Sequence, residues 1–345
     1  MMRSLLYRPS LYALALSIVF FGRSAESGAA QTNGVCQTNL FGAELSARTY
    51  LVIDLSSGST STNYPVAYLA EPPAGGWTDD FKAGKLVLRL IPAGTFMMGS
   101  TEVGSEKGSY EEQHEVALTR SFYIGVFEVT QKQWERVMGA WPSFHANPKL
   151  RDSRPVEQVS YLDIRGGFDG VGWPASINVD MNSFLGRLRS RTGRGFDLPT
   201  EAQWEYAGRA GTVTELNSGT NLTSNERCRN LAKLGQYRYS PTMQHGVPGV
   251  KSGETTKVGS YLPNQWGVYD IHGNVSEWVL DWFGLYPGTV SDPKGPPTGK
   301  YRVYRGGSAG FSANLCIISD RRYDGPGLRH VSLGFRLALP EDPHP

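Results

Sequence analysis

One serine of this chain of 345 residues lies in a pattern typical of a catalytic nucleophile. Ser308 is the centre of the pentapeptide Gly306–Gly307–Ser308–Ala309–Gly310, which has the G-x-S-x-G form of a serine-hydrolase elbow. Asp320, Asp324 and His330 follow it and have the residue types of a catalytic triad. However, the elbow requires a parallel sheet before it and normally far more chain after it than remains here. The pattern therefore gives little support to a serine hydrolase.

The chain also contains three cysteines, Cys36, Cys228 and Cys316. A thiolate can bind a soft metal ion or take part in redox chemistry. In an oxidising compartment an odd number leaves at least one thiol unpaired, or paired with another chain. A lone cysteine is more often a buried and inert thiol. For Cys316, a redox or copper-binding role and an inert core position both remain open.

The element best placed to position such groups is a short helix predicted within residues 198–209. Thr200 and Gln203 have the spacing of a capping box, which begins the helix after Pro199. Both faces of the helix carry apolar bulk, so it should be largely enclosed. Glu205 is then a buried carboxylate that needs a cation, and arginines are available later in the chain. A core helix with no chemistry of its own is the simpler interpretation.

Other elements follow from local patterns. Thr130 and Gln133 form a second capping box, and the helix that they begin should end at Gly139. Apolar residues at helical spacing predict an amphipathic helix that ends at Gly193: Met181, Phe184, Leu185 and Leu188. Short apolar runs predict strands at residues 50–55, 64–69, 85–90 and 121–129. Residues 166–174 and 217–253 are rich in glycine or polar residues and predict loops.

Residues 1–30 have the composition of an export signal peptide. Arg3 and Arg8 supply the positive region, residues 11–21 the apolar run, and residues 27–30 the small residues of a cleavage site. The apolar run is too short for a transmembrane helix, which takes about 20 residues. We therefore expect an exported protein, periplasmic or extracellular, without a transmembrane segment in its mature chain.

The composition indicates an irregular globular protein, because 41 glycines and 21 prolines accompany 8 tryptophans and 17 tyrosines. The net charge of +2 and the lack of a basic block interleaved with aromatic residues give no support to nucleic-acid binding. We divide the mature chain into an N-terminal extension with short strands, residues 31–84, and a main domain, residues 85–340.

Seven segments of the main domain fit one known pattern: IPAGTFMMG (91–99), EVTQKQ (128–133), PVEQVS (155–160), LPTEAQWEYAGRAG (198–211), GVYDIHGNVSEW (267–278), RGGS (305–308) and GFR (334–336). In this order and spacing the chain resembles the formylglycine-generating enzyme, or sulfatase-modifying factor, family. The resemblance implies an α+β fold, irregular and related to C-type lectins, with little regular secondary structure.

The resemblance also implies a copper centre. Family enzymes oxidise a sulfatase cysteine to formylglycine with O2 and a copper(I) ion held by two thiolates five residues apart, and two soft thiolates suit copper(I). Carried over from Ser308, the second thiolate falls on Cys316 and the first on Phe311, which cannot bind copper. Ser312 replaces the histidine that follows the first cysteine in the family. The expected catalytic positions are Ser308 and Cys316, with the copper site incomplete.

Calcium is the second metal that the resemblance implies, since backbone carbonyls and one carboxylate suit this ion. The implied ligands are the carbonyls of His272, Gly273 and Val275 and the carboxylate of Glu277. The alternative is that Glu277 is paired with an arginine in the core. A second family calcium site would begin at Asn230 and Leu231, but the loop after Gln236 offers no matching acidic residue.

Three functions are compatible with these observations. The leading hypothesis is an exported binding or non-standard modifying module without the two-cysteine copper centre, which acts on an extracytoplasmic protein or peptide through a groove beside Ser308, Phe311 and Cys316. A sulfatase is among the candidate partners. The second is a copper-dependent oxidase that uses O2 on a protein thiol, with Cys316 and a ligand not identified. The third is a lectin-like adhesion or scaffold module.

Overall fold

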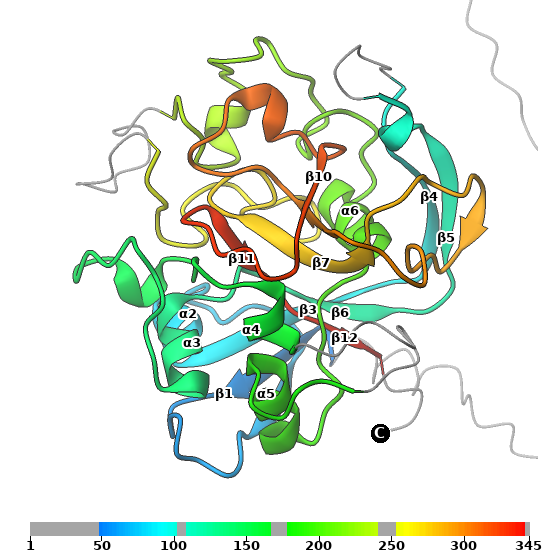
Figure 1. Ribbon diagram of the computed structural model, residues 1–345. Coiled ribbons are helices and arrows are strands. Elements are labelled where there is room, and N and C mark those ends of the chain that lie inside the picture. Colours follow the sequence, from blue (N-terminus) through cyan, green and yellow to red (C-terminus); the bar gives the residue numbers. More distant parts are fainter. Residues whose placement is uncertain (1–47, 102–107, 167–177, 241–252, 342–345) are drawn as a thin grey trace, which may run out of the picture.

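The computed structural model describes residues 48–101, 108–166, 178–240 and 253–341 (Figure 1). Its strands are β1 (Tyr50–Asp54), β2 (Val66–Leu69), β3 (Lys85–Ile91), β4 (Gly94–Met98), β5 (His114–Leu118), β6 (Phe122–Gly125), β7 (Ser276–Trp282), β8 (Val290–Ser291), β9 (Arg302–Arg305), β10 (Arg321–Asp324), β11 (Leu333–Phe335) and β12 (Ala338–Pro340). Its helices are α2 (Asp80–Ala83), α3 (Gln131–Met138), α4 (Tyr161–Arg165), α5 (Phe184–Thr192) and α6 (Glu201–Arg209). Short 3-10 helices are η1 (Gly108–Glu111), η2 (Arg151–Ser153), η3 (Leu231–Lys233) and η4 (Ala313–Leu315).

The strands form three sheets, ordered β12-β6-β3-β1-β2, β10-β9-β7-β11 and β4-β5-β8. With 17% helix and 22% strand, the protein has the predicted α+β class and little regular structure. The predicted signal peptide and Cys36 lie outside the described residues, as does most of the predicted loop at 166–174. Within the described residues, no helix is both long and apolar enough to cross a membrane.

The two strands predicted before residue 84 are confirmed as β1 and β2. β1 pairs antiparallel with β2 on one side and with β3 on the other, so the five-stranded sheet combines them with strands of the main domain. β12, near the end of the chain, pairs with β6 at the opposite edge (Figure 1). Residues 48–84 are therefore built into the same sheet as the strands that follow them.

Helices α3 and α6 begin at their predicted caps, and α3 and α5 end at their predicted glycines. The capping boxes of α3 and α6 are both present, with Thr130 and Thr200 accepting from the N3 amide. α5 ends at Gly193 as predicted, but it begins after Ser183, whose hydroxyl accepts from the Gly186 amide. The predicted position of Met181 on the buried face is wrong, because this residue precedes the cap and is 62% exposed. The strand predicted at 121–129 is shorter, because β6 ends at Gly125.

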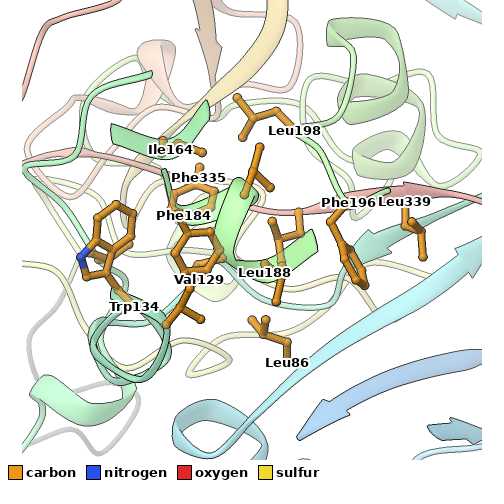
Figure 2. Packing of buried hydrophobic residues seen from close by; sticks show 14 of the residues in the cluster. Leu86, Val129, Trp134, Ile164, Phe184, Leu188, Phe196, Leu198, Phe335 and Leu339 are labelled. Atoms are coloured by element: carbon orange, nitrogen blue, oxygen red, sulfur yellow. The ribbon is translucent and has the colours of Figure 1, made fainter. Parts of the chain in front are cut away.

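The main core lies between the helices and the five-stranded sheet (Figure 2). The ring of Phe184 from α5 stacks on Trp134 from α3 at a centroid distance of 5.2 Å, and it meets Phe335 from β11 edge-on at the same distance. Leu86 of β3 and Leu188 of α5 belong to the same cluster. These apolar contacts attach β11, and with it the four-stranded sheet, to the helical layer.

Candidate functional site

The segment around Ser308 follows β9 and makes two turns at glycines with positive φ. Gly307 has φ +71°, and a Cβ here would lie 2.5 Å from the Sγ of Cys316. Gly306 has φ +96°, and its Cβ would lie 3.1 Å from the Trp204 ring. Only glycine combines this backbone with so close an approach. The Arg-Gly-Gly-Ser motif therefore brings Cys316 against the chain and packs the turn onto α6.

Ser308 and Cys316 lie together but are closed to solvent. Both side chains are completely buried, and the thiol of Cys316 donates to the carbonyl of Ser308 over 3.7 Å. Burial raises the pKa of Cys316 to about 12, so the sulfur is a neutral thiol at physiological pH. The groove predicted beside these residues thus exposes neither of them, and their catalytic roles stay a prediction.

The hydrolase pattern around Ser308 has no triad geometry in the described residues. The Oγ of Ser308 accepts from the amide of Gly310 at 3.3 Å. His330 is exposed and its Nδ1 lies 2.7 Å from the hydroxyl of Ser332. Asp320 accepts from Arg322, and Asp324 accepts from the next amide. The candidate acid and base therefore contact other groups.

Phe311 is half-buried on the outside of an apolar group that we call the thiol cluster: Leu216, Cys228, Leu231, Ala232, Leu234, Tyr237, Ala313 and Cys316. The guanidinium of Arg322 lies 5.1 Å from the centre of the Phe311 ring. The carbonyl of Phe311 accepts from the Arg238 amide at 2.9 Å. The ring therefore completes the packing around Cys316 and forms part of the surface.

His272 connects this region to the segment before β7. Its Nδ1 donates to the carbonyl of Cys316 at 2.7 Å, and its Nε2 accepts from the Asn217 amide at 3.1 Å. Burial lowers the pKa of His272 to about 4, which keeps the ring neutral. Its carbonyl faces Gly235 so closely that a Cβ on that residue would lie 1.5 Å away. His272 is thus a bridging residue of the core with both ring nitrogens in use.

Cys228 differs chemically from Cys316, and no motif in the sequence predicted this difference. Its Sγ accepts from the amide and hydroxyl of Thr223 at 3.4 and 3.5 Å and from the Leu231 amide at 3.5 Å. Burial raises the pKa of Cys228, but these donors outweigh it, so the net pKa is lowered. The two thiols of one cluster therefore differ in acidity. The polar residues around position 223 are the only sequence signal for this difference.

A set of buried ion pairs, which we call the charged centre, surrounds α6: Glu201, Glu205, Glu277, Arg209, Arg305, Arg321 and Arg336. Glu205 accepts from Arg209 at 2.7 and 2.9 Å, from the Gly99 amide at 2.8 Å, and from Arg305. The predicted burial of Glu205 against arginines is confirmed. Glu201, the first residue of α6, is also buried and pairs with Arg321 at 2.6 and 2.8 Å.

Glu277 belongs to the same centre. Its two carboxylate oxygens each accept from Arg336 at 2.5 Å, and one also accepts from the indole of Trp204 at 2.7 Å. The preceding turn is held by another carboxylate, since Glu128 accepts from the Asn274 amide group at 2.6 Å and from the Val275 backbone at 3.0 Å. This is the arginine-paired arrangement that the sequence left as the alternative for Glu277.

The seven sequence segments and the charged centre lie within a part of the chain that matches a known domain family. Residues 82–340 match the family described as the Sulfatase-modifying factor enzyme 1-like domain. The chain belongs to this family. The formylglycine-generating enzyme of Thermomonospora curvata is 34% identical over 284 residues, which cover 72% of this chain and 91% of that enzyme.

Other proteins similar to this chain carry different names. The serine/threonine-protein kinase pkn1 of Chlamydia caviae is 30% identical over 266 residues, which cover 72% of this chain but only 37% of the kinase. Among solved structures, Treponema denticola variable protein 1 is 29% identical, with a TM-score of 0.56, and the match covers 74% of this chain and 95% of that one. Membership of the family thus establishes the fold and leaves the specific function open.

The residues of this family member do not fit the implied copper site. Phe311 supplies an aromatic ring at the first thiolate position, and Cys316 supplies a neutral thiol already donating to Ser308. Copper(I) prefers thiolate ligands. In the part of the chain that the structure describes, no group of three or more His, Cys, Asp and Glu side chains could hold a metal ion.

The implied calcium ligands fit no better. A calcium site needs a carboxylate whose charge is available, and Arg336 already compensates Glu277. At the second implied site, the side chain of Asn230 donates to the Asn221 carbonyl at 3.0 Å, and the amide of Leu231 donates to the thiol of Cys228. Neither contact involves an acidic side chain.

Proposed function

We propose that this protein is a non-oxidase member of the sulfatase-modifying factor family, an exported module that binds a partner or modifies it by a non-standard reaction. The observation that carries this proposal is Phe311 at the position of the first copper thiolate, with its ring packed on the thiol cluster. The buried, neutral thiol of Cys316 supports it, because such a sulfur is a poor ligand and a poor nucleophile.

The partner on this proposal is an extracytoplasmic protein or peptide, with a sulfatase among the candidates. Export rests on the composition of residues 1–30. The surface that would meet the partner is the half-buried Phe311 ring with the guanidinium of Arg322 above it and the exposed Arg238 beside it. An aromatic residue flanked by arginines is a combination enriched in protein interfaces.

The names of the relatives support a role other than cysteine oxidation. Formylglycine-generating enzymes and a protein kinase of Chlamydia caviae share the domain. A domain that occurs beside a kinase and in an oxidase serves more than one chemistry, which is common because function resides in the site rather than in the fold.

The test combines copper(I) titration with an activity assay on the protein beginning at residue 31. A peptide containing Cys-x-Pro-x-Arg is incubated with copper and O2, and mass spectrometry measures conversion of its cysteine to the aldehyde. We expect no conversion and no stoichiometric copper(I) binding by the parent protein. Conversion by the parent that is lost in Cys316→Ser would overturn the proposal in favour of the copper-dependent oxidase.

Phe311→Cys is the matched gain-of-function variant. It places two thiols at the family spacing on an otherwise unchanged scaffold, so we expect it to bind copper(I) more tightly than the parent. Phe311→Ser removes the same ring without adding a thiol and controls for the loss of packing. Equal copper binding by the parent and Phe311→Cys would show that position 311 does not decide the metal chemistry.

A further inference from the structure

A cavity of about 280 Å³ lies on another part of the molecule, where the start of α6 meets the end of β7 and the segment between β7 and β8. Figure 1 shows α6 next to β4 and β5, with β7 on its other side. Ser308, Phe311 and Cys316 do not line it. We propose that this cavity binds a small neutral ligand rich in hydroxyl groups, of the size of a monosaccharide.

Two polar side chains of the cavity lack hydrogen-bond partners on one atom each. His114 and Trp282 line it and are only 8% and 9% exposed. The Nδ1 of His114 lies 3.0 Å from the Glu112 carbonyl, which can only accept, so Nδ1 carries a proton and Nε2 is the acceptor of that tautomer. No group in the described residues bonds that Nε2 or the Nε1 of Trp282, which is a donor.

A hydroxyl group satisfies both kinds of atom, since it donates one hydrogen bond and accepts others. Asp281 adds a third polar group with the same double capacity. One of its oxygens accepts from the Glu201 amide at 2.8 Å. Burial, and then the neighbouring charge of Glu201, raise the pKa of Asp281 to about 7, so near neutral pH it is available in both forms. Three such groups in one cavity favour a polyhydroxylated ligand.

The arginine that lines the cavity, Arg321, is fully engaged, which disfavours an anionic ligand in the interior; Lys294, which also lines the cavity, is exposed. Each of the three guanidinium nitrogens of Arg321 donates, to Glu201, to the Tyr110 carbonyl and to the Gly284 carbonyl. The guanidinium of Arg302 lies 3.4 Å from the centre of the Trp282 ring, so a cation already covers that ring. A carboxylate or phosphate would find no unpaired arginine here, and an amine would leave the indole N–H unsatisfied.

The walls suit the apolar faces of a sugar ring. Tyr286 contacts His114 with ring centroids 4.4 Å apart, and its hydroxyl donates to Glu201 at 3.2 Å, which fixes its orientation. Among the other lining residues are the apolar side chains of Met98, Leu285 and Val290 and three prolines: Pro287, Pro293 and Pro296. The volume is near the lower limit of about 300 Å³ for small-molecule sites, so a single monosaccharide unit fits and a longer chain would have to extend outside.

The test measures binding of a panel of monosaccharides to the full protein by saturation-transfer NMR and calorimetry, and a glycan array then distinguishes a free sugar from the terminal unit of a glycan. We expect at least one sugar to bind with a Kd of about 1 mM or tighter. His114→Phe keeps the ring contact with Tyr286 but removes the acceptor, and Trp282→Phe removes the donor. Each should weaken binding by tenfold or more.

His330→Phe is the matched control, since this histidine is exposed and does not line the cavity, and it should bind as the parent does. Absence of binding by every sugar would overturn the proposal, as would binding that both cavity variants leave unchanged. Preferential binding of acetate, phosphate or an alkylamine over all sugars would also overturn it. Because copper does not enter this experiment, its failure is separate from failure of the proposed function.

Discussion

The charged centre and the thiol cluster hold neighbouring parts of the fold in different ways. In the charged centre, fully buried guanidinium and carboxylate groups join residues far apart in the chain, such as Glu205 with Arg305 and Glu277 with Arg336. The thiol cluster is held by apolar burial and by neutral hydrogen bonds such as that from His272 to Cys316. Removing the partner of a buried charge strongly destabilises the fold, because the other charge stays buried. An apolar cluster, in contrast, can accept a phenyl ring in place of a thiol.

The largest effect should come from breaking a pair in the charged centre. Glu277→Gln removes the charge that compensates Arg336 while keeping the side-chain size. Loss of one partner of a buried pair costs about 3 to 5 kcal/mol, because the other charge stays buried. Urea unfolding of the variant and the parent measures this free energy of unfolding.

Arg329→Gln is the control for that measurement. Arg329 pairs with Asp163 at 2.6 Å, but its side chain is 60% exposed, so solvent screens the pair. We expect a loss of about 0 to 1 kcal/mol. Equal losses for the two variants would mean that burial does not distinguish the charged centre from a surface pair.

The second effect concerns pH and the thiol cluster. The folded pKa of His272, about 4, is below the unfolded value of about 6.5, so the unfolded chain binds more protons between these pH values. The stability that depends on the neutral ring of His272 is therefore present in full above pH ~6.5. As the pH falls towards ~4, the free energy of unfolding decreases by about 3 kcal/mol through this group.

His272→Asn should flatten this part of the curve. The free energy of unfolding of parent and variant is measured at several pH values, and we expect the parent to lose more stability on acidification. Asp281 has a raised pKa and contributes the opposite slope, but both proteins share it. Parallel curves for the two proteins would contradict the buried, neutral state of His272.

A smaller effect is expected at the start of α6. Thr200→Ala removes the side chain that accepts from the Gln203 amide at 3.0 Å. The loss should be about 0.5 to 2 kcal/mol. Ser218→Ala, at an exposed residue outside any helix or strand, should change the stability by no more than about 0.5 kcal/mol. If the two variants unfold alike, the cap does not contribute to holding α6 in the charged centre.

The smallest effect should be that of calcium. A ligand bound only by the folded state raises the melting temperature by mass action. Because Arg336 occupies the Glu277 carboxylate, we expect the same melting temperature in calcium and in EDTA. A rise that disappears in Glu277→Gln would show instead that the carboxylate exchanges its arginine for the ion.

Local signals predicted much of the scaffold. The capping boxes at Thr130 and Thr200 involve residues three apart, so the sequence displays both partners. The helical spacing from Met181 was misleading, because the Ser183 cap begins the helix two residues later and leaves Met181 outside. The short strands before residue 84 were recognisable, but their place beside β3 was not, since strand order depends on long-range pairing.

The candidate sites were less predictable for the same reason. The need of Glu205 for a cation followed from its enclosed helix, and Arg209 lies one turn away, yet Arg305 lies 100 residues along the chain. The residues that line the cavity beside His114 come from several separate segments of the chain, so no single sequence motif predicts it. The replacement of the family's first copper-binding cysteine by Phe311 could be predicted, because the family resemblance identifies the residue expected at that position.

The position of β11, β12 and Arg336 late in the chain determines when the protein can fold. β12 closes one edge of the five-stranded sheet, and Arg336 neutralises Glu277 beneath Trp204. A nascent chain that stops before residue 333 has neither, so β6 keeps an open edge and a carboxylate is buried without its counter-charge. Contacts between residues so far apart in the chain slow folding and leave the sheet edge exposed to aggregation until they form. Synthesis of nearly the whole polypeptide therefore precedes the step that completes its native sheet.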